Sequence, residues 1–139
     1  MRVELSDEAR QYIGRFDELT DVAPKDCLVE GDRLVFLVPA GEMAAAIGRD
    51  GDTVAAVERE LGASIELVED ADTPEAFVAS ALAPAAVNAV TVSEQNDRVA
   101  YVEVPEPDRG VAIGSDGRNI ETARTLAKRH HDIDDIQLT

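Results

Sequence analysis

The sequence predicts an α+β fold in which one small unit, built of helices and a three-stranded sheet, occurs twice. The first observation is an internal repeat: residues 112–117 read Ala-Ile-Gly-Ser-Asp-Gly and match residues 46–51, Ala-Ile-Gly-Arg-Asp-Gly, at five of six positions. The second is their offset of 66 residues, about half of the 139-residue chain and the length of a small domain. The third is that helix-like and strand-like periodicities follow the same order in both halves.

In the first half, Ser6 is a good N-cap, and apolar residues follow it at three- and four-residue spacing. The run 33–38 is almost entirely apolar and is expected to be the central strand of its sheet. The predicted elements are a helix over 6–20, strands over 26–29 and 33–38, a short helix over 41–47, a helix over 52–61 and a strand over 64–68.

The second half begins at an acidic turn in which Thr73 is the predicted N-cap and Pro74 the first helical residue. The domain boundary is therefore expected near residue 71, giving domains of residues 1–71 and 72–139. The predicted elements are a helix over 74–82, strands over 87–93 and 98–104, a short helix ending at 113, a helix over 118–129 and a strand over 132–138.

A Gly-x-x-Gly sequence stands between two helices in each half, as Gly48–Gly51 and Gly114–Gly117. The first glycine permits a positive φ and a close approach of a sugar-phosphate backbone, and the second opens a helix whose N–H groups attract phosphate. A single Gly-x-x-Gly is common at tight turns between helices, but two copies in matched surroundings favour a nucleic-acid clamp.

The run Ile113–Ile120, IGSDGRNI, resembles the signature of the KH domain, in which a hydrophobic residue precedes the glycine pair and Asn plus an aliphatic residue follows it. The order helix, two strands, two helices, strand resembles the type II KH domain. Two such domains filling the chain resemble the archaeal NusA-like transcription factor family. The resemblance implies a tandem KH pair that binds single-stranded RNA and takes part in transcription termination or antitermination.

The RNA-binding residues predicted from this resemblance lie in and beside the two loops. They are Ile47, Gly48, Arg49, Asp50, Gly51 and Val54 in the first copy, and Ile113, Gly114, Ser115, Asp116, Gly117, Arg118, Asn119 and Ile120 in the second. KH loops commonly carry a basic residue between the glycines, so Asp50 and Asp116 leave open whether both loops bind RNA. Arg118 begins its helix where the first copy has Asp52, so the second copy is expected to bind more strongly.

The chain has 29 acidic and 13 basic residues and a formal charge of −16. Dispersed acidity with only two lysines is typical of proteins from salt-loving organisms, in which molar salt screens self-repulsion. A chain this acidic would be repelled by RNA at low salt. An alternative function is therefore an adaptor on RNA polymerase or a ribosomal particle, with secondary RNA contact. Against this, residues 106–131 carry five basic and four acidic residues, so this segment escapes the general acidity.

Nothing in the sequence predicts catalysis, a cofactor or a metal site. His130, His131 and Asp132 are adjacent on a predicted helix end and diverge rather than converge on one ion. The lone Cys27 lies in a strand-like run and is expected to be a buried thiol. Four aromatic residues, Tyr12, Phe16, Phe36 and Phe77, are expected in the core, whereas the position of Tyr101 stays open.

No signal peptide and no apolar run of membrane length is visible in the sequence. We therefore expect a cytoplasmic, monomeric, non-enzymatic protein that does not contact membranes. Its expected partners are single-stranded RNA and, as a second candidate, RNA polymerase or another part of the transcription complex.

Overall fold

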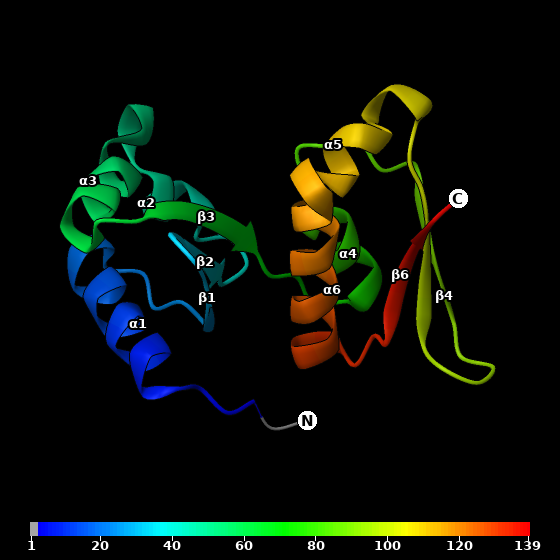
Figure 1. Cartoon of the computed structure of the whole chain (residues 1–139), viewed down its shortest axis with the longest axis horizontal. Coiled ribbons are helices and arrows are strands. Elements are labelled where there is room, and N and C mark those ends of the chain that lie inside the picture. Colours follow the sequence, from blue (N-terminus) through cyan, green and yellow to red (C-terminus); the bar gives the residue numbers. More distant parts are fainter. Residues whose placement is uncertain (1–2) are drawn as a thin grey trace. The chain divides into compact units, whose positions relative to one another are not determined.

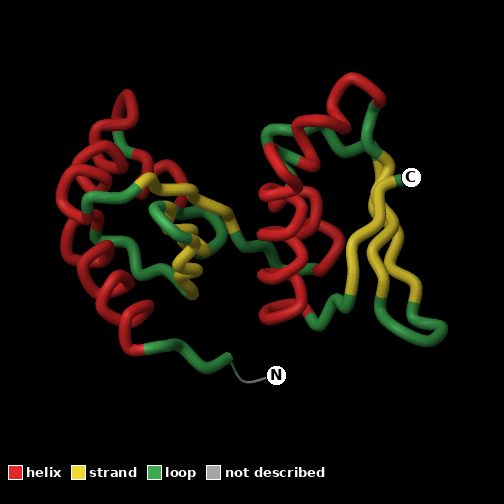
Figure 2. Tube along the Cα trace, in the orientation of Figure 1, coloured by secondary structure: helices red, strands yellow, loops and turns green. Residues whose placement is uncertain are grey.

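The computed structural model describes residues 3–139 (Figures 1 and 2), which form two compact units. One unit is Glu4–Asp70, and the other is Ala71–Thr139 together with Val3. Each unit has a helix, two strands, a short helix, a longer helix and a final strand, and each contains its own three-stranded sheet. The predicted α+β class is confirmed.

The first unit has β2 at the centre of its sheet, as predicted from the apolar run. Strand β1 pairs antiparallel with β2, and β3 pairs parallel with β2. The Ser6 hydroxyl accepts a hydrogen bond from the Ala9 N–H at 3.1 Å and caps the first helix. The elements are α1 (Asp7–Thr20), β1 (Asp26–Glu30), β2 (Arg33–Val38), α2 (Met43–Ile47), α3 (Asp52–Leu61) and β3 (Ser64–Glu69).

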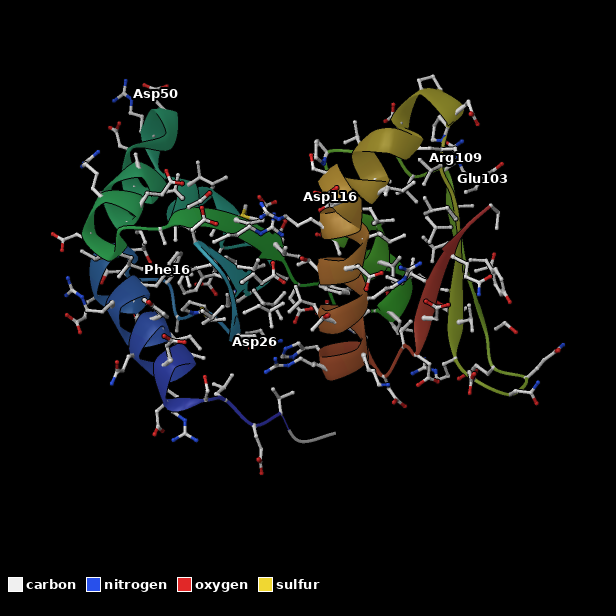
Figure 3. The ribbon with its side chains drawn as sticks, in the orientation of Figure 1. Phe16, Asp26, Asp50, Glu103, Arg109 and Asp116 are labelled. Atoms are coloured by element: carbon white, nitrogen blue, oxygen red, sulfur yellow. The ribbon has the colours of Figure 1, made fainter. Side chains whose placement is uncertain are left out.

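The core of the first unit joins β2 to helices α1 and α3. Phe16 of α1 and Phe36 of β2 are fully buried, with ring centroids 4.4 Å apart, and Val57 of α3 belongs to the same cluster (Figure 3). Cys27 is buried there too, as predicted. Burial raises the pKa of its thiol to about 12, and the negative charges of Asp26 and Glu8 act in the same direction. This thiol is therefore held in its unreactive protonated form.

The second unit repeats this topology, with β5 central, β4 antiparallel to it and β6 parallel to it. Helices α4 and α6 pack together on one face of the sheet (Figure 1). Along β5, Ala100 and Val102 are buried, whereas Tyr101 and Glu103 are exposed. The elements are α4 (Pro74–Ala81), β4 (Ala89–Ser93), β5 (Val99–Glu103), α5 (Arg109–Ile113), α6 (Arg118–His131) and β6 (Asp135–Leu138).

Four element ends differ from the sequence prediction by two residues or more, one of them the start of β6, which lies at Asp135 rather than at residue 132. Helix α2 begins at Met43 rather than at residue 41, because Gly41 has a φ of 85°. Strand β4 begins at Ala89 rather than at residue 87. Just before it, the Ala86 N–H donates a hydrogen bond to the Asp108 carboxylate at 2.6 Å. Helix α6 continues to His131 and ends where Asp132 adopts a φ of 55°. No helix in residues 3–139 is long and apolar enough to cross a membrane.

Candidate nucleic-acid interface

The two Gly-x-x-Gly loops have the same backbone conformation. Gly48 has φ 78° and ψ 173°, and Gly114 has φ 79° and ψ 173°. The closing glycines match as well, with φ 77° and ψ 13° at Gly51 and φ 75° and ψ 10° at Gly117. In each unit the loop links a five-residue helix, α2 or α5, to a longer one, α3 or α6. The sequence repeat is thus a repeat in three dimensions.

The first glycine of each loop is required by the helix that follows it. A Cβ on Gly48 would lie 2.1 Å from the Thr53 Oγ1 atom, and one on Gly114 would lie 2.8 Å from the Asn119 backbone nitrogen. The sequence predicted a positive φ here, which both glycines have, and a close approach of RNA, which stays a prediction. The contact with the protein's own following helix is an additional reason for glycine. The second glycine has open space around it and is needed for its positive φ.

The aspartates between the glycines also have a backbone role. Asp50 has a φ of 54° and Asp116 a φ of 56°, in the left-handed region. Among residues other than glycine, Asp and Asn enter this region most readily. The acidic residue that departs from the KH pattern therefore suits the conformation of the loop. Both aspartates are exposed, at the loop tips that Figure 3 labels.

Each loop contains N–H groups that are available to an anion. The Asp52 N–H donates to the Arg49 carbonyl oxygen, and the Arg118 N–H donates to the Ser115 carbonyl oxygen. Within residues 3–139, four loop N–H groups have no hydrogen-bond acceptor: those of Arg49, Asp50, Ser115 and Asp116. These donors can bind a phosphate oxygen without breaking an existing bond.

The second loop has a support that the first lacks. The Asn119 side-chain amide donates to the carbonyl oxygens of Val111 at 3.3 Å and Ala112 at 3.2 Å. These bonds tie the last turn of α5 to the first turn of α6. Thr53 occupies the corresponding place in the first unit, and its side chain makes no such bond within the described chain.

The predicted apolar residues differ in their accessibility. Ile47 and Ile113, which precede the loops, are each 38% exposed. Val54 is half-buried, and Ile120 is only 6% exposed, so it packs beneath the loop. Val111 is 45% exposed and was missed by the sequence analysis. The sequence could have indicated this exposure. In a helix as short as α5, Ala112 is the buried residue, so its apolar neighbour Val111 faces away from the core.

Cations without a partner gather on these loops and the helices that follow them. Six of the described basic residues form ion pairs with carboxylates, and Arg109 donates to the Thr139 carbonyl oxygen at 2.9 Å. In the described part of the chain, four basic residues have neither an ion pair nor a side-chain hydrogen bond: Arg49, Arg59, Arg118 and Lys128. Each lies on a Gly-x-x-Gly loop, on α3 or on α6.

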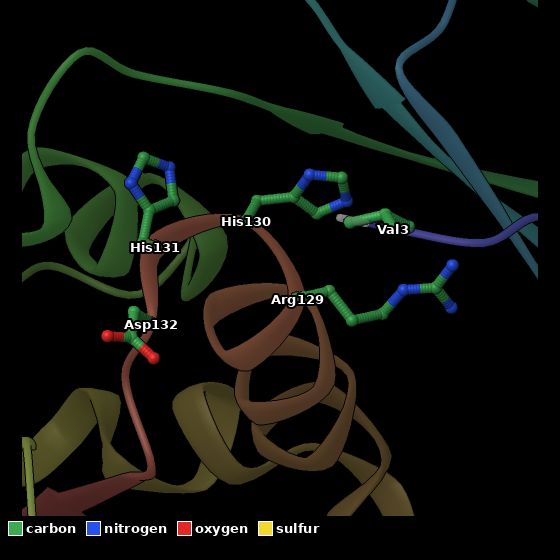
Figure 4. A pocket seen from close by; sticks show the side chains of 5 residues that line it. All are labelled: Val3, Arg129, His130, His131 and Asp132. Carbon is green, nitrogen blue, oxygen red and sulfur yellow. The ribbon is translucent and has the colours of Figure 1, made fainter. Parts of the chain in front are cut away.

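A pocket of about 310 Å³ lies at the other end of α6, lined by Val3, Arg129, His130, His131 and Asp132 (Figure 4). The 14-residue helix separates it from the second loop by about 20 Å. The two histidine side chains diverge, and the His131 ring stacks on Phe77 with centroids 4.6 Å apart. Among the described residues, no group of three or more His, Cys, Asp or Glu is arranged to hold a metal ion.

The chain is similar to a known protein family and to known proteins. The model of the NusA-like second KH domain matches residues 74–139, which include the second loop. A protein of Halobacterium salinarum called "Probable transcription termination protein NusA" is 61% identical over the whole length of both chains. The chain belongs to the NusA family.

Two further relatives agree with this membership. A NusA of Halococcus morrhuae, also named a probable transcription termination protein, is 57% identical over 99% of both chains. A solved structure described as the crystal structure of APE1850 is 30% identical, with a TM-score of 0.83, and the likeness covers 97% of this chain and all of that one. The acidic composition is consistent with these relatives from Halobacterium and Halococcus, as the predicted halophilic character requires.

Proposed function

We propose that this NusA-family chain binds single-stranded RNA through two tandem type II KH domains, residues 1–71 and 72–139, and acts in transcription termination or antitermination. The observation that carries the proposal is the pair of Gly-x-x-Gly loops with matching torsions, each with two unpaired backbone N–H groups. The relatives named as probable transcription termination proteins supply the biological role.

In the proposed complex the RNA backbone crosses each loop. Phosphate oxygens accept hydrogen bonds from the loop N–H groups, and Arg49 and Arg118 contribute positive charge beside them. Bases lie against Ile47 and Ile113, which are exposed. Ile120 acts from below, because its burial fixes the start of α6 rather than offering a surface to RNA.

The site is proposed to work without an enzyme activity or a cofactor, in a cytoplasmic monomer. Binding by a chain of charge −16 must rest on short-range hydrogen bonds and apolar contacts, since these survive the screening of molar salt.

The same charge favours a second candidate function, an adaptor on RNA polymerase or a ribosomal particle that contacts RNA only secondarily. The two candidates differ in what the loops must do. An RNA-binding factor depends on them, whereas an adaptor retains its main contact when they are altered.

The test is an RNA titration of a loop variant with a matched control. Gly117→Asp places a charge in the second loop, and the new Cβ meets no atom within 4 Å. Gly31→Asp makes the same change in the β1–β2 turn, where φ is 63° and space is also open. By fluorescence anisotropy in molar potassium chloride, we expect Gly117→Asp to weaken binding to a random single-stranded RNA pool about tenfold or more, and Gly31→Asp to leave it unchanged.

Circular dichroism confirms that both variants are folded before titration. If the unaltered protein binds no RNA in this pool but co-purifies with polymerase or ribosomal subunits, the adaptor function replaces the first proposal. Equal losses from both variants would show that the negative charge, and not its place in the loop, weakens binding.

A further inference from the structure

The sheet of the second unit has one uncovered face. Helices α4 and α6 lie on the opposite face (Figure 1), and the uncovered one presents residues from all three strands. Tyr101 stands at its centre, 39% exposed, between Thr91 of β4 and Gln137 of β6. A hollow of about 170 Å³ adjoins the ring, lined by Ser93, Gln95, Asn96, Asp97, Val99 and Tyr101. The ring is thus available to a partner.

Strand β4, at one edge of this face, lacks the usual protection of a sheet edge. Its sequence Ala89–Ser93 reads AVTVS and contains no charge, proline or glycine. The other three edge strands of the described chain, β1, β3 and β6, each carry at least one carboxylate. Natural proteins usually place charges or proline on an edge strand to prevent another strand from pairing with it. An uncharged edge in so charged a chain is open to strand addition.

The surroundings of this edge are anionic. The three strands contain no Lys or Arg, and the exposed Glu103 lies on the uncovered face. Asp135 of β6 has the same register side, but Arg124 of α6 neutralises it in an ion pair at 3.1 Å. Two further arginines near this sheet are also engaged. Arg98 is held by Glu94 at 2.9 Å and by two backbone carbonyl oxygens at the end of α6, and Arg109 donates to the Thr139 carbonyl oxygen at 2.9 Å. Such a face repels a phosphate backbone and favours a cationic segment.

We propose that an extended, lysine- or arginine-bearing segment of a partner protein adds to the β4 edge as a fourth strand. Its backbone pairs with the outer groups of β4, which have no strand neighbour. Alternate side chains of the segment lie over Thr91 and Tyr101, and its cations approach Asp97 and Glu103. This surface is distinct from the loops proposed to bind RNA, so both can be occupied by different molecules.

The test uses a fluorescein-labelled peptide of alternating valine and lysine as the probe, titrated in molar potassium chloride to screen non-specific attraction. Thr91→Lys and Gln137→Lys form a matched pair, since both residues are exposed neighbours of Tyr101 on opposite edges. We expect Thr91→Lys and Tyr101→Ala to weaken peptide binding about tenfold, and Gln137→Lys by less than about threefold. RNA binding is unchanged in all three variants.

Amide chemical shifts locate the peptide independently of any variant, and the expected perturbations centre on Ala89–Ser93. Equal losses from the two lysine variants would reveal general charge attraction and overturn the proposal. So would perturbations confined to β6 or to the helices, or an absence of binding. Loss of RNA binding in Tyr101→Ala, with the peptide still bound, would make this face a nucleic-acid surface instead.

Discussion

Two constraints, the backbone torsion angles and the lack of space for a Cβ, require glycine at positions 48 and 114. Their φ near 78° with ψ at 173° lies in a region of backbone space that is essentially restricted to glycine. The Cβ of any other residue would also collide with Thr53 or Asn119 at the start of the next helix. Gly51 and Gly117 lie instead in the ordinary left-handed region, and the space around them is open, so only their positive φ favours glycine.

Alanine substitution should separate the two kinds of glycine. We expect Gly114→Ala to lower the free energy of unfolding by about 3 kcal/mol or more, since backbone strain and overpacking add. Gly117→Ala should cost about 1–2 kcal/mol, because only the left-handed conformation is strained. Guanidinium unfolding in molar potassium chloride measures both. Equal costs would mean that α6 shifts freely away from the glycine and does not define the loop.

For single residues, the sequence predicted where the loops lie but not every physical reason why glycine is required there. The five-of-six repeat located both glycine pairs, and the sequence also predicted a buried Cys27 and four core aromatic residues. Phe16, Phe36 and Phe77 are fully buried, Tyr12 packs half-buried against the core, and Tyr101 is exposed. The collision at Gly114 was not predictable, because it depends on how α6 approaches the glycine, which periodicity does not report.

Helices α5 and α6 act as one element because Asn119 joins them. Its amide bonds satisfy two of the carbonyl groups that the end of α5 leaves unpaired. The corresponding residue of the first unit, Thr53, does not make this connection within the described residues. The second loop is therefore held between two coupled helices, whereas within residues 3–139 the Thr53 side chain makes no such link for the first.

Removing the amide should loosen the second helix pair specifically. We expect Asn119→Ala to lower stability by about 1–2 kcal/mol and to speed amide hydrogen exchange in α5. Thr53→Ala is the matched control, because it truncates the corresponding residue without removing a hydrogen bond, and exchange in α2 should stay unchanged. If Asn119→Ala leaves the exchange rates of α5 unaltered, the two helices are held by packing and the amide is dispensable.

Element boundaries were predictable where a cap or a continuous pattern marks them. Strand β2 and helix α3 have the predicted bounds, and Thr73 accepts a hydrogen bond from the Ala76 N–H as a cap should. The start of β4 was not predictable, because the bond from Ala86 to Asp108 joins residues 22 positions apart. The edge position of β4 likewise follows from strand pairing, which the sequence of one strand does not determine.

For the molecule as a whole, the question is how a chain of charge −16 holds a polyanion. Within residues 3–139, the cations without a partner include Arg118 at the second loop, and Asp52 takes its place in the first unit. Both residues are exposed at the first position of a helix that follows a loop. A carboxylate there repels phosphate, whereas a guanidinium attracts it and can donate two hydrogen bonds to it. The second loop is therefore expected to supply the larger share of RNA affinity.

Charge reversal at these two positions tests that ranking. We expect Arg118→Asp to weaken RNA binding about tenfold and Asp52→Arg to strengthen it by about threefold to tenfold. The change in net charge is equal and opposite, so a difference in size reports the local contact. Asp7→Arg is the control for net charge, since Asp7 also lies in the first turn of a helix and its side chain is 97% exposed. It should leave affinity nearly unchanged in molar potassium chloride, where the screening length is about 3 Å.

The dependence on salt distinguishes contact from general attraction. Each phosphate neutralised on a single strand adds about 0.7 to the slope of log affinity against log salt, so Arg118→Asp should make that slope shallower and Asp52→Arg should make it steeper. The Asp7→Arg protein should have the slope of the unaltered chain. An equal gain from Asp7→Arg and Asp52→Arg would show that overall charge governs binding, and a larger loss from an altered first loop than from the second would reverse the ranking. Either result would remove Arg118 from the proposed phosphate contact while leaving the family assignment, which rests on the whole chain, intact.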